Sequence, residues 1–466
     1  MKQRFTATFL LLALLLALAG CASYTPEPLD PAAQQAALQQ RRLDDPGLHR
    51  YIRGTDAGGE TAAWPPASWD LPLLTLTALY YQPDIDRAGA RRLAAEAAVI
   101  SAGGRPNPTA DVSSEHSANP PEDISPWTNG ISLQLPIETA GKRPLRIDTA
   151  QARARAAQLR EVDTLWQVRS RVRATLLASY PQETALQQQR DLQRQITAIL
   201  QRRLDAGYAS RPELTRAQLD LDSTTLSLGE ARKARAENLA HLAAAVGLPA
   251  AALDDVQISY DSFARLPAPQ TLPDAQARQL ALLNRADVLA ALADYEAAQS
   301  DLQLEIARQY PDLNIGPGYL WDQGERKWTL DLSLLAPLLN RNRGPIAEAR
   351  AQRQVAAAAF LSAQAEAIAE LDTALTGYRH AAQILRDAEA LLQRQQHNEQ
   401  ATGTAFRAGE ADRLDWLSAR YETAAAEQAR TRALIEANRS LGQLEDALRL
   451  PLGADASAAL STPYAK

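Results

Sequence analysis

The chain has 466 residues, of which 46% are hydrophobic and 5% aromatic, and its formal net charge at pH 7 is −6. Nucleic acid attracts basic surfaces, so this acidic composition excludes nucleic-acid binding as a function class. The low aromatic content and the long segments rich in Ala, Leu, Gln and Arg favour long packed helices over compact globular domains.

Residues 1–20 have the features of a bacterial lipoprotein signal peptide. Lys2 and Arg4 precede an apolar stretch, and the run LAGC ending at Cys21 is similar to a lipobox, in which the cysteine becomes the acylated first residue. The alternative is an ordinary signal peptide with a cysteine nearby. Cys21 is the only cysteine in the chain, so no internal disulfide is expected.

The residues after Cys21 indicate the destination. Ala22 and Ser23 stand where an Asp commonly retains such lipoproteins in the inner membrane, so a lipid-anchored position in the outer membrane is predicted. No later stretch has the roughly 18 apolar residues that a membrane-spanning helix requires. Residues 21–72 mix Gln, Pro, Gly and charge and are expected to form a lipidated tether along the surface.

The first structured segment is predicted over 73–250. A helix from Leu73 ends near Gly103, and two strands follow at about 109–118 and 125–135, with Asp111, Ser113 and Glu115 on one strand face. A helix from about 141 to 206 comes next, about 100 Å long at 1.5 Å per residue, with a kink or break at Pro181. The returning helix, 212–246, carries Leu214, Leu221 and Leu228 at heptad spacing, which indicates coiled-coil packing.

A linker over 251–273, with a possible short strand at 255–260, leads to a second segment over 274–450. A helix over about 275–309 precedes strands at about 312–321 and 326–335. Helices over about 345–408 and onward to 450 then follow, and residues 451–466 form a tail.

The two segments are copies of one plan. The run WTNGISLQLPIETAGK begins at Trp127 and WTLDLSLLAPLLNRNR begins at Trp328, so that Pro136 and Pro337 mark matching strand-to-helix transitions 201 positions apart. The turns at Gly207 and Gly409 match at an offset of 202. An internal repeat of this length predicts a tandem-duplicated architecture.

The strands alternate between apolar and polar residues, as in the wall of a membrane β-barrel with its polar face toward the lumen. Four strands cannot close a barrel, and open edges cannot persist in hydrocarbon because their backbone groups would be unpaired. Two chains would give eight strands filled by their own side chains, whereas three give twelve and a water-filled lumen. A homotrimer embedded in outer-membrane lipid is therefore predicted.

This pattern resembles the TolC-like outer membrane efflux family over essentially the whole mature chain. The likeness is carried by LQLPIETAGKRPLRI, LLAPLLNRNRGPIAEAR, RRLDAGYASRPELTRAQLDL and AFRAGEADRLDWLSARYE. The GKR and NRNRG runs after the strand pairs are most similar to the heavy-metal, CzcC-like branch. The fold class implied is an α+β membrane protein: four barrel strands per chain, twelve in the trimer, and long periplasmic coiled-coil helices.

The resemblance also implies a function and partners. It implies an exit duct of a tripartite efflux pump, which works with a periplasmic adaptor and an inner-membrane pump, most often of the RND type. Heavy-metal cations are the cargo of the branch it most resembles. With 5 His, one Met and one Cys in the chain, no metal-ligand cluster supports that branch chemically, and no cofactor is expected.

Acids near the two glycine turns are candidates for the periplasmic entrance. In the family, an acid matching Asp415 rings the entrance and one matching Glu213 joins the links that hold it closed. The alternative is that both acids cap the start of a returning helix. Ala411 and Ser418 depart from the family pattern, so the partner is left open among three arginines: Arg211, Arg407 and Arg413.

Other functions are disfavoured. No Ser-His-Asp set, phosphate loop or paired-carboxylate site falls on a plausible scaffold, so an enzyme is not expected. His116 and His241 are isolated from other potential metal ligands in the sequence.

Several strand residues have two interpretations. Asp111, Glu115 and Asp331 either tune the passage of ions or only provide a hydrated surface on a pore wall. Three tryptophans near the strands suggest either an interfacial girdle or packing between protomers: Trp127, Trp321 and Trp328. The competing class is a periplasmic coiled-coil adaptor or scaffold lipoprotein.

Overall fold

The computed structural model describes residues 23–55, 64–120, 123–335 and 339–452. Cys21 and Pro337, two of the predicted site residues, lie outside these ranges. The chain separates into a unit that ends at Arg42 and a second that begins at Leu43. In the first unit, helix α2 (Pro31–Gln39) has no buried residue.

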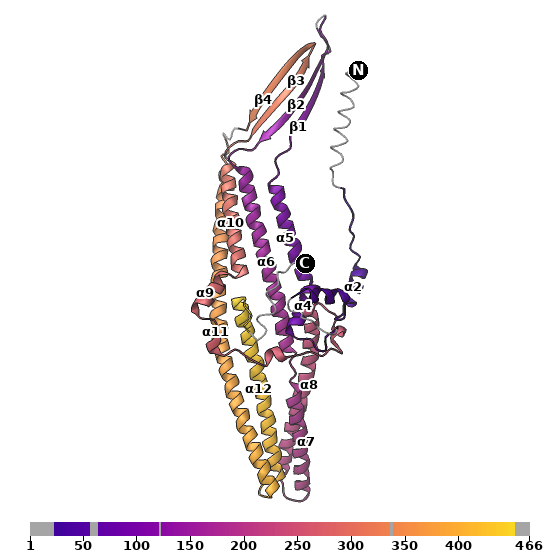
Figure 1. The fold of residues 1–466 in the computed structure, drawn as a ribbon, viewed down its shortest axis with the longest axis vertical. Helices are drawn as coiled ribbons and strands as arrows, with labels where there is room; N and C mark the ends of the chain where they lie inside the picture. The colour runs from indigo at the N-terminus through magenta and orange to yellow at the C-terminus, as the bar shows by residue number, and fades with distance from the viewer. Residues whose placement is uncertain (1–22, 56–63, 121–122, 336–338, 453–466) are drawn as a thin grey trace. The chain divides into compact units, whose positions relative to one another are not determined.

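The second unit contains long helices and one sheet (Figure 1). The helices are α3 (Pro46–Arg53), α4 (Leu71–Tyr81), α5 (Pro83–Ala102), α6 (Lys142–Ala178), α7 (Glu183–Asp205), α8 (Arg211–Val246), α9 (Ala275–Leu283), α10 (Ala286–Ala307), α11 (Arg343–Ala408) and α12 (Arg413–Leu448). Short 3-10 turns lie at η2 (Ala250–Leu253), η3 (Asp261–Phe263) and η4 (Pro269–Thr271). Within the described ranges, no helix combines the length and apolar character needed to cross a membrane.

The sheet has four antiparallel strands in the order β1-β2-β3-β4. Their bounds are β1 (Thr109–His116), β2 (Trp127–Ile137), β3 (Leu313–Asp322) and β4 (Glu325–Leu334). The two predicted strand pairs are therefore present and join each other through β2 and β3. Because β1 and β4 are the outer strands, each pairs on one side only among the described residues.

The largest core lies where α3, α4, α6 and α8 meet, and it corrects the prediction of a surface tether. Leu48, Ile52 and Trp69 fall in the predicted tether, yet they are 0%, 1% and 3% exposed and belong to this core. Leu48 and Ile52 are four residues apart, so they share one face of α3 and insert together. The expectation of a surface tether is therefore wrong for these three residues.

The predicted strand at 255–260 is also wrong. Only Ile258 pairs, in an isolated parallel bridge with Trp69, through hydrogen bonds from Trp69 N to Gln257 O (2.8 Å) and from Ser259 N to Trp69 O (2.9 Å). The bridge cannot lengthen because Asp70 already serves as the N-cap of α4, where its side chain accepts from Leu73 N (3.0 Å).

The helices predicted over 73–103 and 275–309 are each interrupted, and at matching positions. Gln82 and Arg285, 203 positions apart, have extended backbones and separate α4 from α5 and α9 from α10. Their side chains bond to the ends of the returning helices. Gln82 Nε2 donates to Ala245 O (2.6 Å), and Arg285 Nη1 donates to Ala447 O (3.0 Å). The repeat therefore extends to this tertiary contact.

The break predicted at Pro181 is confirmed. Helix α6 ends at Ala178 and α7 begins at Glu183, since a proline inside a helix removes a backbone donor and clashes with the preceding turn. The second repeat has no such break, and α11 runs for 66 residues, about 100 Å.

Candidate functional site

The sheet has one polar and one apolar face across all four strands. Residues in register share a face, and Asp111, Ser132, Gly318 and Thr329 lie in one such row. Counting by two from that row gives a mainly polar face. Its polar residues are Thr109, Asp111, Ser113, Glu115, Thr128, Ser132, Gln134, Asn314, Asp322, Glu325, Lys327, Thr329, Asp331 and Ser333, and the same rows also contain Gly130, Pro136, Gly316, Gly318 and Leu320. Asp111, Ser113 and Glu115, which were predicted to share a strand face, therefore do so, and Asp331 of β4 lies on the same face of the sheet.

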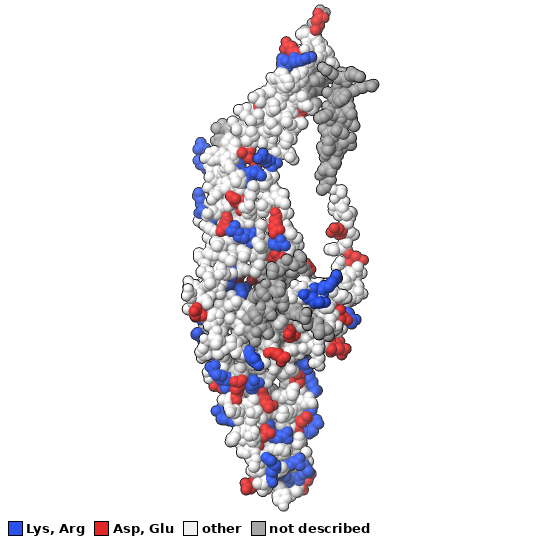
Figure 2. All heavy atoms as spheres, in the orientation of Figure 1, with Lys and Arg blue, Asp and Glu red and all other residues white. Residues whose placement is uncertain are grey.

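The opposite face is mainly apolar, and its polar residues are Ser114, His116, Asn129 and Arg326. Its residues include Val112, Ile131, Leu133, Leu135, Ile315, Tyr319, Leu330, Leu332 and Leu334. The three predicted girdle tryptophans lie on it, with Trp127 at 47% and Trp328 at 84% exposure. In Figure 2 the charged side chains cluster over the helices and at one end of the sheet, and the visible sheet between them is largely free of charge. Such a face is suited to hydrocarbon, and the polar face is suited to a water-filled lumen.

The strand-to-helix junctions repeat a left-handed residue. Gly141 (φ 70°) precedes α6 and Asn342 (φ 57°) precedes α11, 201 positions later. Pro136 lies within β2, opposite Asn314. The junctions are then fixed by side chains from the GKR and NRNRG runs. Lys142 Nζ donates to Tyr310 O and Asp312 Oδ1, both at 2.7 Å.

The second junction uses a different group for the same purpose. The side-chain amide of Asn342 donates to Glu305 O (2.7 Å) and to Glu305 Oε2 (2.8 Å) at the end of α10. In the first junction, Arg143 Nε donates to Gly103 O (2.7 Å) beyond the end of α5. These bonds set the direction in which the helices leave the sheet.

Gly207 and Gly409 lie at the turns between α7 and α8 and between α11 and α12. Their φ angles are 79° and 80°, and neither would bring an added Cβ within 4 Å of another group. The left-handed backbone, rather than a close contact, is therefore what these turns require of glycine.

Glu213 and Asp415 both close capping boxes. Glu213 Oε2 accepts from Ser210 N (2.8 Å) and Ser210 Oγ (2.9 Å), and Asp415 Oδ2 accepts from Asp412 N (3.2 Å). Hydrogen bonds from the backbone and then from the hydroxyl of Ser210 lower the pKa of Glu213. The capping role weighed from the sequence is thus present in the single chain, and both acids remain exposed at the ends of their helices.

The ion pair that links the two turns involves residues that the sequence did not indicate. Arg203, near the end of α7, pairs with Asp412, the N-cap of α12. Of the three arginines proposed as partners, Arg407 bonds within α11 to Gly403 O (3.0 Å), and Arg211 and Arg413 begin α8 and α12. The available signal for Asp412 was its position three residues before Asp415, which is the spacing of a capping box.

Comparison with known proteins agrees with this geometry. A family model described as "Outer membrane efflux protein" matches residues 75–248 and 277–454. The cobalt-zinc-cadmium resistance protein CzcC of Cupriavidus metallidurans is 27% identical over 304 residues, which cover 63% of this chain and 70% of CzcC.

Two solved structures share the fold. The outer membrane protein VceC of Vibrio cholerae superposes with a TM-score of 0.65 at 21% identity, over 81% of this chain and 95% of VceC. The CmeC outer membrane channel of Campylobacter jejuni superposes with a TM-score of 0.63 at 17% identity, over 92% of this chain and 90% of CmeC. The TolC-like fold predicted from the sequence is confirmed.

Proposed function

Because the chain belongs to the outer membrane efflux protein family, we propose that it is a lipid-anchored, trimeric exit duct for heavy-metal cations. The sheet supports the proposed assembly, because it has an apolar face, a polar face and two outer strands that, within the described part of the chain, pair on one side only. In a membrane those outer strands require partners, and β1 of one copy against β4 of the next provides them. Three copies close twelve strands around a lumen.

The partners follow from this role. An inner-membrane pump, most often of the RND type, supplies the energy, and a periplasmic adaptor joins it to the helix turns at Gly207 and Gly409. The similarity to CzcC supports heavy-metal cations as the cargo. No group of three or more His, Cys, Asp or Glu side chains suited to a metal ion occurs in the part of the chain that the structure describes. The duct is therefore proposed to pass cations without holding them, and selection lies with the pump.

Deleting this chain from its source strain is expected to raise sensitivity to zinc, cobalt and cadmium, with restoration by the wild-type chain. Sensitivity to hydrophobic drugs, measured in parallel, separates metal export from general export. Unchanged metal tolerance with increased drug sensitivity would overturn the cargo assignment. No change in either sensitivity would contradict the proposed function as an exit duct.

Chains with Cys21→Ser, tested in the same strain, should lose fatty-acid labelling if Cys21 is the acylated residue.

Asp415 is proposed to form a ring of three acids at the resting entrance, with Glu213 nearby, in addition to capping its own helix. Charges held close in a narrow mouth concentrate the potential and attract cations. We expect Asp415→Asn to weaken cation preference in planar bilayers, while Asp415→Glu, which keeps the charge, retains it. Asn keeps a polar group at the capping position, so an exclusively capping role predicts equal selectivity in all three proteins, and that result would refute the ring.

A further inference from the structure

The two β-hairpins of the sheet have the same strand register. In the first hairpin His116 of β1 lies opposite Trp127 of β2, and in the second Tyr319 of β3 lies opposite Trp328 of β4. Both ring pairs meet edge to face, with centroids 4.6 Å and 5.1 Å apart. The repeat offset is 203 for the first strand of each hairpin and 201 for the second, so each pair of one hairpin corresponds to a pair of the other.

The contact between β2 and β3 shows how one hairpin is placed beside the next. Thr128 of β2 pairs with Glu115 of β1 on one side and with Asp322 of β3 on the other. The repeat equivalent of Glu115 is Gly318, and Asp322 lies four residues beyond it. Strands in a barrel are staggered in this way because they tilt relative to the barrel axis. The sheet therefore has a stagger of four residues from one hairpin to the next.

A closed barrel requires the same stagger at every hairpin, since its strands share one tilt. In a trimer with two hairpins per chain, half of the contacts between hairpins are the β2–β3 contact inside each chain. The other half lie between copies, where β4 of one copy meets β1 of the next. Applying the stagger of the β2–β3 contact to these two strands gives a single register.

We infer that residues 329–334 of one copy pair antiparallel with residues 114–119 of the next, with Ser333 directly opposite Glu115. The inference rests on the proposed function, since it specifies the interface between the copies of the trimeric duct. It fixes which residues face each other across that interface and how far the copies are displaced from each other along the barrel axis.

The polar face is continuous in this register. Ser132 lies opposite Gly318 in the β2–β3 contact, and their repeat equivalents are Ser333 and Glu115. All four positions are on the polar face, so the lumen wall has the same polarity between copies as inside the chain. The interface between copies differs in one respect, because Glu115 stands where the internal contact has a glycine.

The apolar face is matched as well. Inside the chain, Tyr319 lies between the aliphatic Ile131 on one side and a tryptophan on the other. In the inferred register His116 lies between Leu332 of the neighbouring copy and a tryptophan of its own chain. Pairs of aromatic and aliphatic side chains across neighbouring strands stabilise a sheet. The same kind of neighbours therefore flanks both rings.

Other registers are less favourable. Side chains keep their faces only if the register shifts in steps of two residues. One step sets Glu115 directly opposite Asp331, and like charges that face each other destabilise a sheet. A second step in the same direction sets Glu115 opposite Thr329 and removes the stagger that the barrel requires. Steps in the other direction raise the stagger above the four residues found inside the chain.

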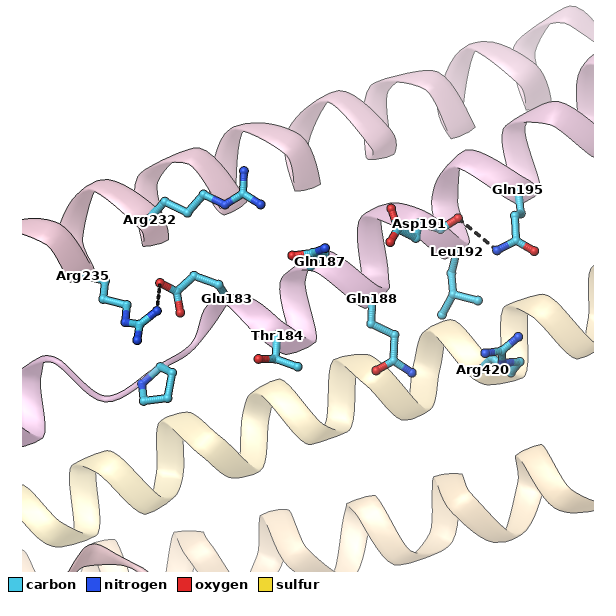
Figure 3. A pocket seen from close by; sticks show the side chains of 11 residues that line it. Glu183, Thr184, Gln187, Gln188, Asp191, Leu192, Gln195, Arg232, Arg235 and Arg420 are labelled. Atoms are coloured by element: carbon cyan, nitrogen blue, oxygen red, sulfur yellow. Dashed lines mark hydrogen bonds and ion pairs between the residues drawn. The ribbon is translucent and has the colours of Figure 1, made fainter. Parts of the chain in front are cut away.

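The helical surfaces tolerate small axial shifts, in contrast to the strands. A groove of about 700 Å³ beside α7 is lined mainly by polar and charged side chains (Figure 3). Its ion pair between Arg235 and Glu183 has a separation of 3.6 Å, and the Arg235 side chain is 44% exposed. Long exposed side chains adapt to a shift at little cost because water screens their charges. A strand ladder changes only in whole steps, so the sheet is the part that fixes the alignment of the copies.

The register is tested with cysteine pairs in the full-length protein. Trp127 O accepts from Gln323 N (3.1 Å), which places the non-hydrogen-bonded pairs of the β2–β3 contact at even-numbered residues of β2. Side chains approach most closely at such pairs, and the pair of Ser333 with Glu115 is the equivalent of one of them. Under mild oxidation, chains with Glu115→Cys and Ser333→Cys should form disulfides between copies and give covalent trimers on a denaturing gel without reductant.

Two shifted pairs serve as controls: Glu115→Cys with Asp331→Cys, and Glu115→Cys with Thr329→Cys. Residues two positions along a facing strand are about 7–8 Å away, which is too far for an unstrained disulfide. We expect several-fold less covalent trimer from the shifted pairs, and the single-cysteine variants give the background, including any contribution of Cys21. More cross-linking in a shifted pair than in the Ser333 pair, or equal cross-linking in all three, would overturn the register.

A charge placed opposite Glu115 gives an independent test. Ser333→Lys should raise the temperature at which the trimers dissociate by several degrees and Ser333→Glu should lower it, because opposite charges facing each other across strands attract and like charges repel. Both effects should vanish in the Glu115→Gln background. Ser132→Lys is the matched control, since Ser132 faces Gly318 inside the chain and its variant should not respond to Glu115→Gln.

The outcomes separate the register from the proposed function. Trimers that dissociate at the same temperature whether Lys or Glu replaces Ser333, or that form no disulfide with any of the cysteine pairs, would overturn the register and leave the trimeric duct intact. A purified protein that remains monomeric in detergent would contradict the proposed function itself.

Discussion

Replacing Glu445 by Gln is expected to destabilise the protein by about 3–5 kcal/mol, the cost of removing one partner from a buried ion pair. Glu445 is on α12 and is 2% exposed. Its Oε2 lies 3.1 Å from Arg173 Nε and 3.4 Å from Arg169 Nη1, both on α6, and these side chains are 8% and 10% exposed. Without the carboxylate, two guanidinium groups remain buried with less charge to balance them.

The cost is raised by the surroundings of Arg173. Burial lowers the pKa of its guanidinium, which shows that the interior disfavours the positive charge, and the negative charge of Glu445 acts in the opposite direction. Arg173 Nη1 also donates to Asn438 O (2.9 Å), so the side chain has little freedom to leave the interior. The loss of the Glu445 charge should therefore weaken the contact between α6 and α12, which joins the two repeats.

The same helix provides the control. Glu436 pairs with Arg439 at 2.5 Å, but both side chains are more than half exposed, at 54% and 58%. Glu436→Gln should change the stability by about 0–1 kcal/mol because water screens exposed pairs. Thermal unfolding of the purified protein in detergent measures both variants, and a Tm for Glu445→Gln as high as that for Glu436→Gln would contradict the assignment.

The parts of the fold that could be predicted from the sequence are those that depend on residue patterns within one strand or helix. The alternation around Trp328 places apolar and polar residues on opposite faces of β4, and the heptad leucines of α8 give a helix that packs along one stripe. The break at Pro181 follows from one residue type. In each case the signal and the structure lie within a few residues of each other.

Features set by distant contacts were not predictable in this way. No proline marks the interruption of the helix at Arg285. The extended backbone there is stabilised by hydrogen bonds from the Arg285 side chain to Ala447 O and, at 2.8 Å, to Glu370 Oε2. The ion pair between Arg203 and Asp412 joins positions 209 residues apart. The average composition of the predicted tether concealed Leu48 and Ile52, which only their spacing on α3 reveals.

The capping boxes illustrate a different limit. The sequence placed Glu213 and Asp415 at the start of their helices and left capping and gating as alternatives. The single chain shows the capping bonds, whereas the proposed ring of acids would require several copies of the chain. A local pattern can therefore identify the residue without deciding what the assembled molecule does with it.

A second large effect is expected at Gly247, the C-cap of α8. Its φ is 87°, and an added Cβ would lie 3.0 Å from Tyr81 Cβ and 3.2 Å from both Tyr81 C and Tyr81 O. Gly247→Ala should therefore combine a left-handed backbone penalty of about 1–2 kcal/mol with crowding against backbone atoms, which costs about 1–3 kcal/mol more. The position offers no flexible side-chain end that could move aside.

Gly409→Ala separates these two contributions, because Gly409 has nearly the same φ, 80°, and nothing within 4 Å of an added Cβ. Its loss of stability should be the backbone penalty alone. The repeat supports this reasoning, since Arg449 stands 202 positions after Gly247, adopts a φ of 51° and has a full side chain there. Tyr81 is matched by Asn284 in the second repeat, so the crowding partner differs. We expect Gly247→Ala to lower the Tm clearly more than Gly409→Ala; equal decreases would show that Tyr81 moves aside and that only the backbone conformation demands glycine at the end of α8.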